Sequence, residues 1–293
     1  MDDGSVLLVE IARGTLSRVQ PDGSVEVVAE CGGGPNGAAI GPDGAVYICN
    51  NGGFAWRTVE GMLLPGMQPD DYVGGSIQRV DLDTGEVTTL YTECDGWSLQ
   101  GPNDIVFDRH GGFYFTDLGK GRTRELDRGG IYYAAADGSS ITTVTRPLVT
   151  PNGIGLSPDE DRLYYAETMT GRVRWWDIAE PGVVGTAGPE LSSSQGAPSR
   201  LLGVVLGDGR VDSLAVDSEG NVCVATLGTG AVTAFAPDGS LRAVVPVPGE
   251  PMVTNVCFGG PELRTAYITC SAFGRLVSHE WHCPGLPLNF LNT

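Results

Sequence analysis

The chain has 293 residues, including 44 glycines and 19 prolines, and its formal net charge is -18. This excess of acidic side chains argues against binding to nucleic acid or to anionic membranes, because both require clusters of Lys and Arg. The sequence has no apolar run of about 18 residues and no charged-then-apolar leader, so we expect neither a membrane span nor export.

The cysteines indicate a reducing compartment. There are seven of them, an odd number, and no Cys-x-x-Cys spacing occurs. Several fall within apolar runs, where Cys behaves as a small hydrophobic residue. Disulfides are rare in the cytoplasm, so the pattern predicts a cytoplasmic protein with free thiols.

One phrase recurs along the chain: a Pro-Asn or Val-Asp pair, an alternating apolar run, a turn and a second apolar run. The copies occupy residues 35–50, 102–117, 151–167 and 211–226, with a degenerate copy at 253–269. Alternating apolar residues on both sides of a Gly-containing turn predict a β-hairpin. A unit of this size cannot bury its apolar face alone, so the copies must pack against one another.

A second pair of apolar runs follows each of the first four hairpins, which gives four strands per unit, as in a propeller blade. Residues 15–29 supply the outer pair of an earlier blade, and a lone strand from Val6 precedes them. We therefore predict an all-β propeller of about six blades with four antiparallel strands in each. It occupies residues 1–293 as one domain, with the first blade incomplete at its N-terminus and almost no helix.

A long insertion, residues 50–75, separates the second strand of one blade from the third. Long ordered loops in compact domains are usually functional, and this one is predicted to be a lid over the channel mouth. Its aromatic residues Phe54, Trp56 and Tyr72, with Trp97 further along the chain, are candidates for contact with substrate.

The repeats also align a set of polar residues. The first strand of each propeller blade lines the central channel, so the starts of these strands meet at one end of it. The residues at this position are Asn36, Asn103, Asn152, Asp212 and Thr254. Asn after Pro often only turns the chain. The change to Asp at position 212 has no such explanation, and the set forms an oxygen-rich ring suited to Ca²⁺, Mg²⁺ or Mn²⁺.

The units PNGIGLSPDEDRLYYAE, GPNDIVFD, FYFTD, VDSLAVDSEGNVCVA and FGGPELRTAYIT together resemble the gluconolactonase, regucalcin (senescence marker protein) and luciferin-regenerating enzyme family. The resemblance covers nearly the whole chain. It implies a six-bladed propeller that holds one divalent cation in its channel and hydrolyses sugar lactones or related esters. The implied partner is a small lactone, and the implied cation is Ca²⁺, with Mn²⁺, Mg²⁺, Fe²⁺ or Zn²⁺ as alternatives.

The resemblance also assigns residues. Asn152 and Asp212 match metal ligands, and Asn103 matches the polar residue that contacts substrate and often the metal-bound water. The family's Glu ligand is expected a few positions before Met1, and Glu10, which closes the run VLLVE, is a possible substitute. Some members carry a substrate-binding Arg where this chain has Gly101.

The predicted function is metal-assisted opening of a lactone, in which a cation-activated water attacks the carbonyl and Asp212 accepts its proton. Two alternatives stand beside it. One is a non-catalytic propeller that binds a small ligand after losing its metal, and the other is an esterase of the same fold, since fold alone does not determine chemistry.

Overall fold

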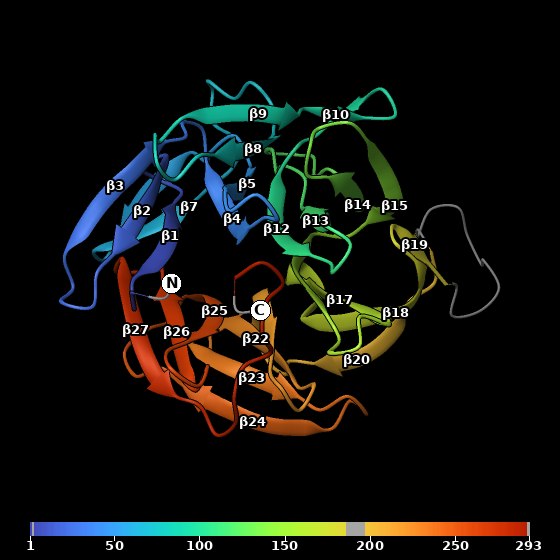
Figure 1. Cartoon of the computed structure of the whole chain (residues 1–293). Helices are drawn as coiled ribbons and strands as arrows, with labels where there is room; N and C mark the ends of the chain where they lie inside the picture. The colour runs from blue at the N-terminus through green and yellow to red at the C-terminus, as the bar shows by residue number, and fades with distance from the viewer. Residues whose placement is uncertain (2, 186–196, 292–293) are drawn as a thin grey trace.

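The computed structural model of the chain describes residues 1, 3–185 and 197–291. Six antiparallel sheets are arranged around a central axis, and the chain passes through them in order (Figure 1). This arrangement confirms the predicted six-bladed β-propeller. The helical content of the described residues is a single 3-10 turn, η1 (Thr168–Thr170), and none of them belongs to a helix able to cross a membrane.

The first three blades are built as follows. Blade one consists of β1 (Val6–Glu10), β2 (Thr15–Val19) and β3 (Val25–Glu30). Blade two consists of β4 (Pro35–Ile40), β5 (Val46–Asn50), β8 (Ser76–Val80) and β9 (Val87–Tyr91). Blade three consists of β12 (Pro102–Phe107), β13 (Gly112–Asp117), β14 (Gly129–Ala135) and β15 (Ile141–Leu148). Two small hairpins, β6 (Trp56–Val59) with β7 (Met62–Pro65) and β10 (Glu93–Cys94) with β11 (Trp97–Ser98), lie outside these sheets.

The last three blades follow the same order. Blade four consists of β16 (Pro151–Leu156), β17 (Arg162–Glu167) and β18 (Arg172–Glu180), with β19 (Val183–Val184) and β20 (Arg200–Val204) both paired to β18. Blade five consists of β21 (Arg210–Val216), β22 (Val222–Leu227), β23 (Ala231–Phe235) and β24 (Leu241–Pro246). Blade six consists of β25 (Val253–Gly259), β26 (Thr265–Cys270) and β27 (Arg275–Glu280).

Blades one and six depart from the predicted four strands, since each has three in the described part of the chain. In blade one, β1 pairs with β2 alone and forms one edge of the three-stranded sheet. In blade six, the chain leaves the sheet after β27 and crosses the channel instead of adding an outer strand. The first blade was expected to be incomplete; the three-stranded last blade was not.

The core lies between the blades, where each sheet packs face to face against the next. Every residue of β5, β13 and β16 is buried, because these strands are covered on both faces. Tyr47 of blade two meets the ring of Phe107 of blade three edge-on, with 5.0 Å between ring centroids. This packing fixes the position of the inner strands relative to one another.

The C-terminal segment closes one end of the channel. Leu286 N–H donates to the carbonyl of Val216 at 3.0 Å, and the Asn289 amide donates to the carbonyl of Phe107 at 3.2 Å. Val216 and Phe107 are the last residues of their inner strands, so the tail crosses the end of the channel away from Asn103 and Asp212. Figure 1 shows the C-terminus near the centre of the ring.

Candidate metal and catalytic site

The predicted ring residues lie at the starts of the inner strands of blades two to six, and an irregularity in the strand pairing occurs there in each of these five blades. The register shifts between Pro102 and Ile105, between Pro151 and Ile154, and between Val211 and Leu214. Similar shifts span Asn36 and Thr254. A bulge bends the strand and changes where a side chain points. The side chains of the ring residues therefore do not follow the regular alternation between the two faces of their sheets.

Two glycines let the inner strands approach closely beside the ring. A Cβ atom at Gly153 would lie 2.7 Å from the backbone oxygen of Asp212, and one at Gly37 would lie 2.4 Å from the backbone oxygen of Asn103. No side chain fits at such distances, so only glycine allows this backbone contact. As a result Asn152, next to Gly153, lies beside Asp212 on the neighbouring strand.

The two central amides have acceptor atoms without partners. Asn103 and Asn152 are 6% and 3% exposed, and the Oδ1 atom of each is buried with no hydrogen bond from the described residues. The Asn152 Nδ2 donates to the Thr168 hydroxyl at 2.9 Å, which leaves Oδ1 as the free end of that amide. An unsatisfied buried acceptor costs about 1–3 kcal/mol. Such oxygens are natural ligands for a hard cation.

A carboxylate lies beside them. Asp212 is half-buried, and burial raises its pKa to about 7, with a further rise from the charge of Asp104 and an opposing effect of the Asn152 amide. Cation binding would favour the ionised form and lower this pKa again. The site thus contains two free amide oxygens and one carboxylate that ionises near neutral pH.

Sequence reasoning missed Asp104. This carboxyl group is 7% exposed, and burial raises its pKa to about 7. Its Oδ2 accepts a hydrogen bond from the backbone N–H of Ile154 in β16 at 3.3 Å, and Oδ1 accepts one from Ile105 at 3.0 Å. It therefore joins blades three and four just below the ring. A charged residue inside the apolar run PNDIVF was the signal that could have identified it.

The ring is uneven around the channel. Thr254 of blade six exchanges a hydrogen bond with the Thr269 hydroxyl at 2.9 Å, so its oxygen already has a partner. Asn36 of blade two is half-buried. The ring oxygens that are buried without a partner or belong to a carboxyl group therefore come from blades three, four and five.

Carboxylates that end the second strands lie on the same face as the ring, but their hydrogen bonds serve the loops. Asp117 is 3% exposed and accepts N–H bonds from Gln100 and Gly101, both at 2.7 Å, so it holds the segment that leads into Asn103. Glu10 is ion-paired with Arg13 at 2.9 Å and also accepts a bond from Ser17. Its role as a substitute ligand stays a prediction.

The insertion at 50–75 is attached to the same loops. The Tyr72 hydroxyl donates to the carbonyl of Gln100 at 2.5 Å, three residues before Asn103. Lys120, only 1% exposed, donates to the carbonyl of Gly53 at 2.6 Å, and its ammonium lies 4.3 Å from the centre of the Phe54 ring. Burial lowers the pKa of Lys120 to about 8.

The hairpin β6–β7 within this insertion extends across the face of the propeller. Leu63 N–H donates to the carbonyl of Ala272 in the turn between β26 and β27 at 3.2 Å, so the hairpin reaches from blade two to blade six. Trp56, at its start, packs edge-on against Phe54 with 5.9 Å between ring centroids. The role of this insertion as a lid over the channel mouth stays a prediction.

Trp97 lies elsewhere. It is 63% exposed on β11, and the guanidinium of Arg146, in the outermost strand of blade three, lies 4.9 Å from the centre of its ring. Contact between Trp97 and a substrate remains a prediction.

Comparison with known proteins places the chain in a family. The family model described as SMP-30/Gluconolactonase/LRE-like region matches residues 1–272. A lactonase drp35 from Staphylococcus saprophyticus is 31% identical over 84% of this chain and 68% of its own length. A gluconolactonase from Zymomonas mobilis is 26% identical over 81% of this chain, which spans 61% of that relative.

Solved structures agree in fold. A gluconolactonase from Xanthomonas campestris has a TM-score of 0.70 at 23% identity, covering 92% of this chain and 80% of its own. Regucalcin from Agrobacterium tumefaciens, described as a calcium-binding protein, has a TM-score of 0.70 at 21% identity over 99% and 91% of the two chains. With the match extending over residues 1–272, the chain belongs to the SMP-30/gluconolactonase/LRE-like family.

Proposed function

We propose that this protein is a lactone hydrolase that uses a divalent cation held at the mouth of the propeller channel. The observation that carries the proposal is the pair of buried, unpartnered amide oxygens of Asn103 and Asn152. With the carboxylate of Asp212 beside Asn152, they make a set of oxygen ligands that fits a hard cation. Relatives named lactonase and gluconolactonase support the reaction class.

Asn103, Asn152 and Asp212 would hold the cation. When bound, it would polarise the lactone carbonyl and make a water molecule more acidic. The all-oxygen ligand set favours Ca²⁺ first and Mn²⁺ or Mg²⁺ next over softer ions such as Fe²⁺ or Zn²⁺, and the calcium-binding description of the Agrobacterium regucalcin agrees with this order.

The protein's own groups would then divide the remaining work. Asp212 would accept the proton of the attacking water, because its carboxyl group is the ring group with a pKa of about 7. Asn103 would orient a substrate oxygen. Asp104 would hold the inner strands of blades three and four in place through Ile154, so we assign it a positioning role.

The insertion at 50–75 would cover the substrate. Phe54, Trp56 and Tyr72 present apolar ring faces that suit the carbon skeleton of a lactone. Lys120 would keep the insertion in place through Gly53 and the ring of Phe54. Covering the site would exclude bulk water and strengthen the electrostatic interactions at the ring.

The free thiols of all seven cysteines support the cytoplasm as the working compartment. Within it, a small lactone is the proposed substrate. No Arg stands at position 101 to pair with an acidic one, since that residue is Gly101.

The deciding experiment is hydrolysis of a panel of sugar and aliphatic lactones by protein treated with a chelator and then supplied with Ca²⁺, Mn²⁺, Mg²⁺, Fe²⁺ or Zn²⁺. The expected result is turnover of at least one lactone that disappears on chelation and returns with one of these ions. Binding of a lactone without turnover under every condition would overturn the proposal and favour the non-catalytic binder.

A further inference from the structure

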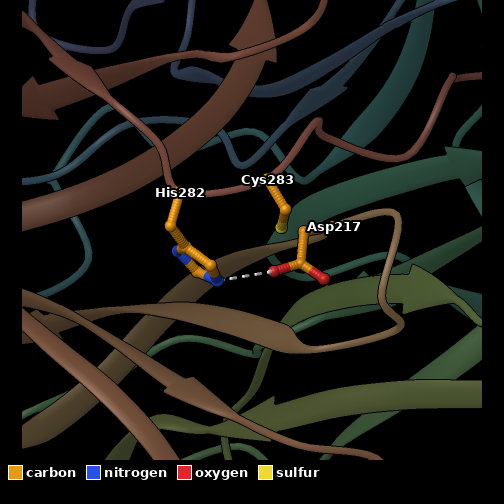
Figure 2. Close-up of side chains that lie close together, drawn as sticks. All are labelled: Asp217, His282 and Cys283. Atoms are coloured by element: carbon orange, nitrogen blue, oxygen red, sulfur yellow. Dashed lines mark ion pairs between the residues drawn. The ribbon is translucent and has the colours of Figure 1, made fainter.

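A second group of ligand-type side chains lies at the opposite end of blade five. Asp217 follows the last residue of β21, and His282 and Cys283 follow β27 in the C-terminal tail. Their ligand atoms all lie within 4.8 Å of one another, and Figure 2 shows the three side chains pointing toward a common centre. No other trio of His, Cys, Asp or Glu in the described ranges is grouped this closely.

This cluster is separate from the channel site. Asp212 stands at the start of β21 and Asp217 just after its end. Five residues of extended chain separate the two carboxylates, or roughly 15 Å at the usual rise of a strand. An ion held at one site therefore leaves the other free.

The carboxylate of the cluster is held in a fixed orientation. The Asp217 side chain is fully buried, and both of its oxygens accept bonds from the Asn221 amide, at 3.0 and 2.9 Å. Backbone N–H groups of Asn221 and Glu219 add two more, at 2.9 and 3.1 Å. Hydrogen-bonded outer groups of this kind are what orients a carboxylate for metal binding.

The other two side chains are an exposed imidazole and a buried thiol, whose sulfur is a soft ligand. The His282 side chain is 39% exposed, and its Nε2 lies 3.9 Å from Asp217 Oδ2, too far for a hydrogen bond but close to the separation of two ligands on one ion. Cys283 is 5% exposed. Cys binds Zn²⁺ as the thiolate, so a cation that binds sulfur would displace the thiol proton.

We propose that Asp217, His282 and Cys283 form a binding site for Zn²⁺ or another thiophilic divalent ion, which fastens the C-terminal tail to blade five. One nitrogen, one sulfur and one oxygen ligand match the preferences of Zn²⁺ and not those of Ca²⁺ or Mg²⁺. At bond lengths of about 2.0–2.3 Å, ligand atoms on one ion are closer together than the 4.8 Å within which these three atoms lie, so the side chains would move inward when the ion binds. The exposed His282 side chain has the freedom to make that movement.

The location gives the ion a structural task. The tail is already paired with the β21–β22 hairpin, since Ser218 N–H donates to the carbonyl of Pro284 at 2.9 Å and Leu286 N–H to that of Val216 at 3.0 Å. The same tail closes the channel further on, through Asn289. An ion shared by Asp217 and Cys283 would join two segments that only hydrogen bonds and packing now connect.

Co²⁺ tests the proposal directly, because it replaces Zn²⁺ and absorbs strongly when a thiolate binds it. Full-length protein is treated with a chelator and titrated with Co²⁺ and then with Zn²⁺ as competitor. We expect a thiolate-to-cobalt band that saturates near one equivalent and is abolished by Zn²⁺. His282→Ala and Cys283→Ser should each weaken binding at least tenfold and remove or greatly reduce the band.

Two matched controls separate this site from other histidines and thiols. His279→Ala changes an exposed imidazole on neighbouring β27, and Cys257→Ser changes the exposed cysteine of β25; both should keep the band. Asp212→Asn should keep it too, so the result stands apart from that of the channel site. Because His282 lies at the surface, His282→Ala should fold normally. A band of equal strength in His282→Ala and wild type, or no thiolate band in the wild type, would overturn the proposal.

Discussion

The Asn152 amide lies beside the carboxylate of Asp212 and lowers its pKa, yet burial and the nearby Asp104 raise that pKa more, to about 7. The two residues come from neighbouring inner strands that touch backbone to backbone at Gly153. Ionisation of Asp212 is therefore unfavourable in the folded protein unless a cation binds beside it.

Asp212→Asn should abolish cation-dependent lactone hydrolysis while making the cation-free protein more stable at pH 8. The raised pKa means that the buried charge destabilises the fold above about pH 7, and this cost disappears as pH falls toward the ordinary value of 3.8. Allowing for partial exposure, the gain at pH 8 is about 1–2 kcal/mol. Thermal unfolding at pH 8 and pH 4, with exposed Asp208→Asn as control, measures it. Loss of stability at pH 8 would contradict the assignment.

Cation affinity should decrease as pH falls below about 7. Protons and the cation compete for Asp212, so affinity should drop up to about tenfold per pH unit in this range and level off above pH 8. Calorimetric titration with Ca²⁺ at pH 8, 7, 6 and 5 tests this dependence. An affinity that stays constant over the whole range would show that Asp212 is not a ligand.

Asn103→Leu should remove activity with little change in stability. The Oδ1 atom of Asn103 is buried without a partner, and replacing an unsatisfied acceptor by an apolar group of similar shape is close to neutral. We expect kcat/KM to fall by at least about a hundredfold. Asn289→Leu, the control, should lower stability and leave activity unchanged, because the Asn289 amide donates to the carbonyl of Phe107 and to the carboxylate of Glu160. A strongly destabilised Asn103→Leu protein would indicate a structural role for this amide.

Lys120→Met should loosen the insertion at 50–75. The change removes the bond to the carbonyl of Gly53 and the contact between the ammonium and the Phe54 ring, which together hold the insertion against the neighbouring loop. Trypsin should then cleave several-fold faster after Arg57, an exposed residue of β6. Arg242→Met on the outer face serves as the control. Unchanged cleavage in Lys120→Met would show that other contacts hold the insertion.

Glu10→Gln should leave cation affinity within about twofold of wild type. Glu10 is ion-paired with Arg13 and bonded to Ser17, and an exposed pair of this kind contributes little to either stability or binding. Calorimetric titration with Ca²⁺ is the measurement. A tenfold loss of affinity would instead make Glu10 the substitute ligand that the family resemblance suggested.

Most of the fold could be predicted from the repeats in the sequence. Copies of one hairpin phrase at regular spacing leave few alternatives to stacked blades, and the position of Asn103, Asn152 and Asp212 within each copy placed them on one axis. Local patterns predicted this much because strand alternation and turn residues act over short distances.

Contacts between distant segments were harder to predict. The partners of Lys120 and Tyr72 lie in other loops, so nothing near them in sequence indicates burial. Asp104 looked like a strand residue among apolar neighbours until the packing of β12 against β16 gave its carboxyl group a partner. The meeting of Asp217 with His282 depends on the route of the tail, which no periodicity encodes.

The close contacts at Gly37 and Gly153 separate two properties of the molecule that could otherwise vary together. At these two points backbone atoms set the spacing between β4 and β12 and between β16 and β21, so substitutions of side chains elsewhere should change that spacing little. Within residues 50–75 the comparable close contacts with backbone oxygens are local to the insertion: a Cβ atom at Gly52 would lie 2.6 Å from the backbone oxygen of Gly74, and one at Gly66 would lie 2.4 Å from that of Ala55. Under the proposed function, new substrate preferences can arise at the other positions of the insertion while the spacing of the inner strands stays the same, and engineering for altered specificity should begin with residues 54–72 other than Gly66.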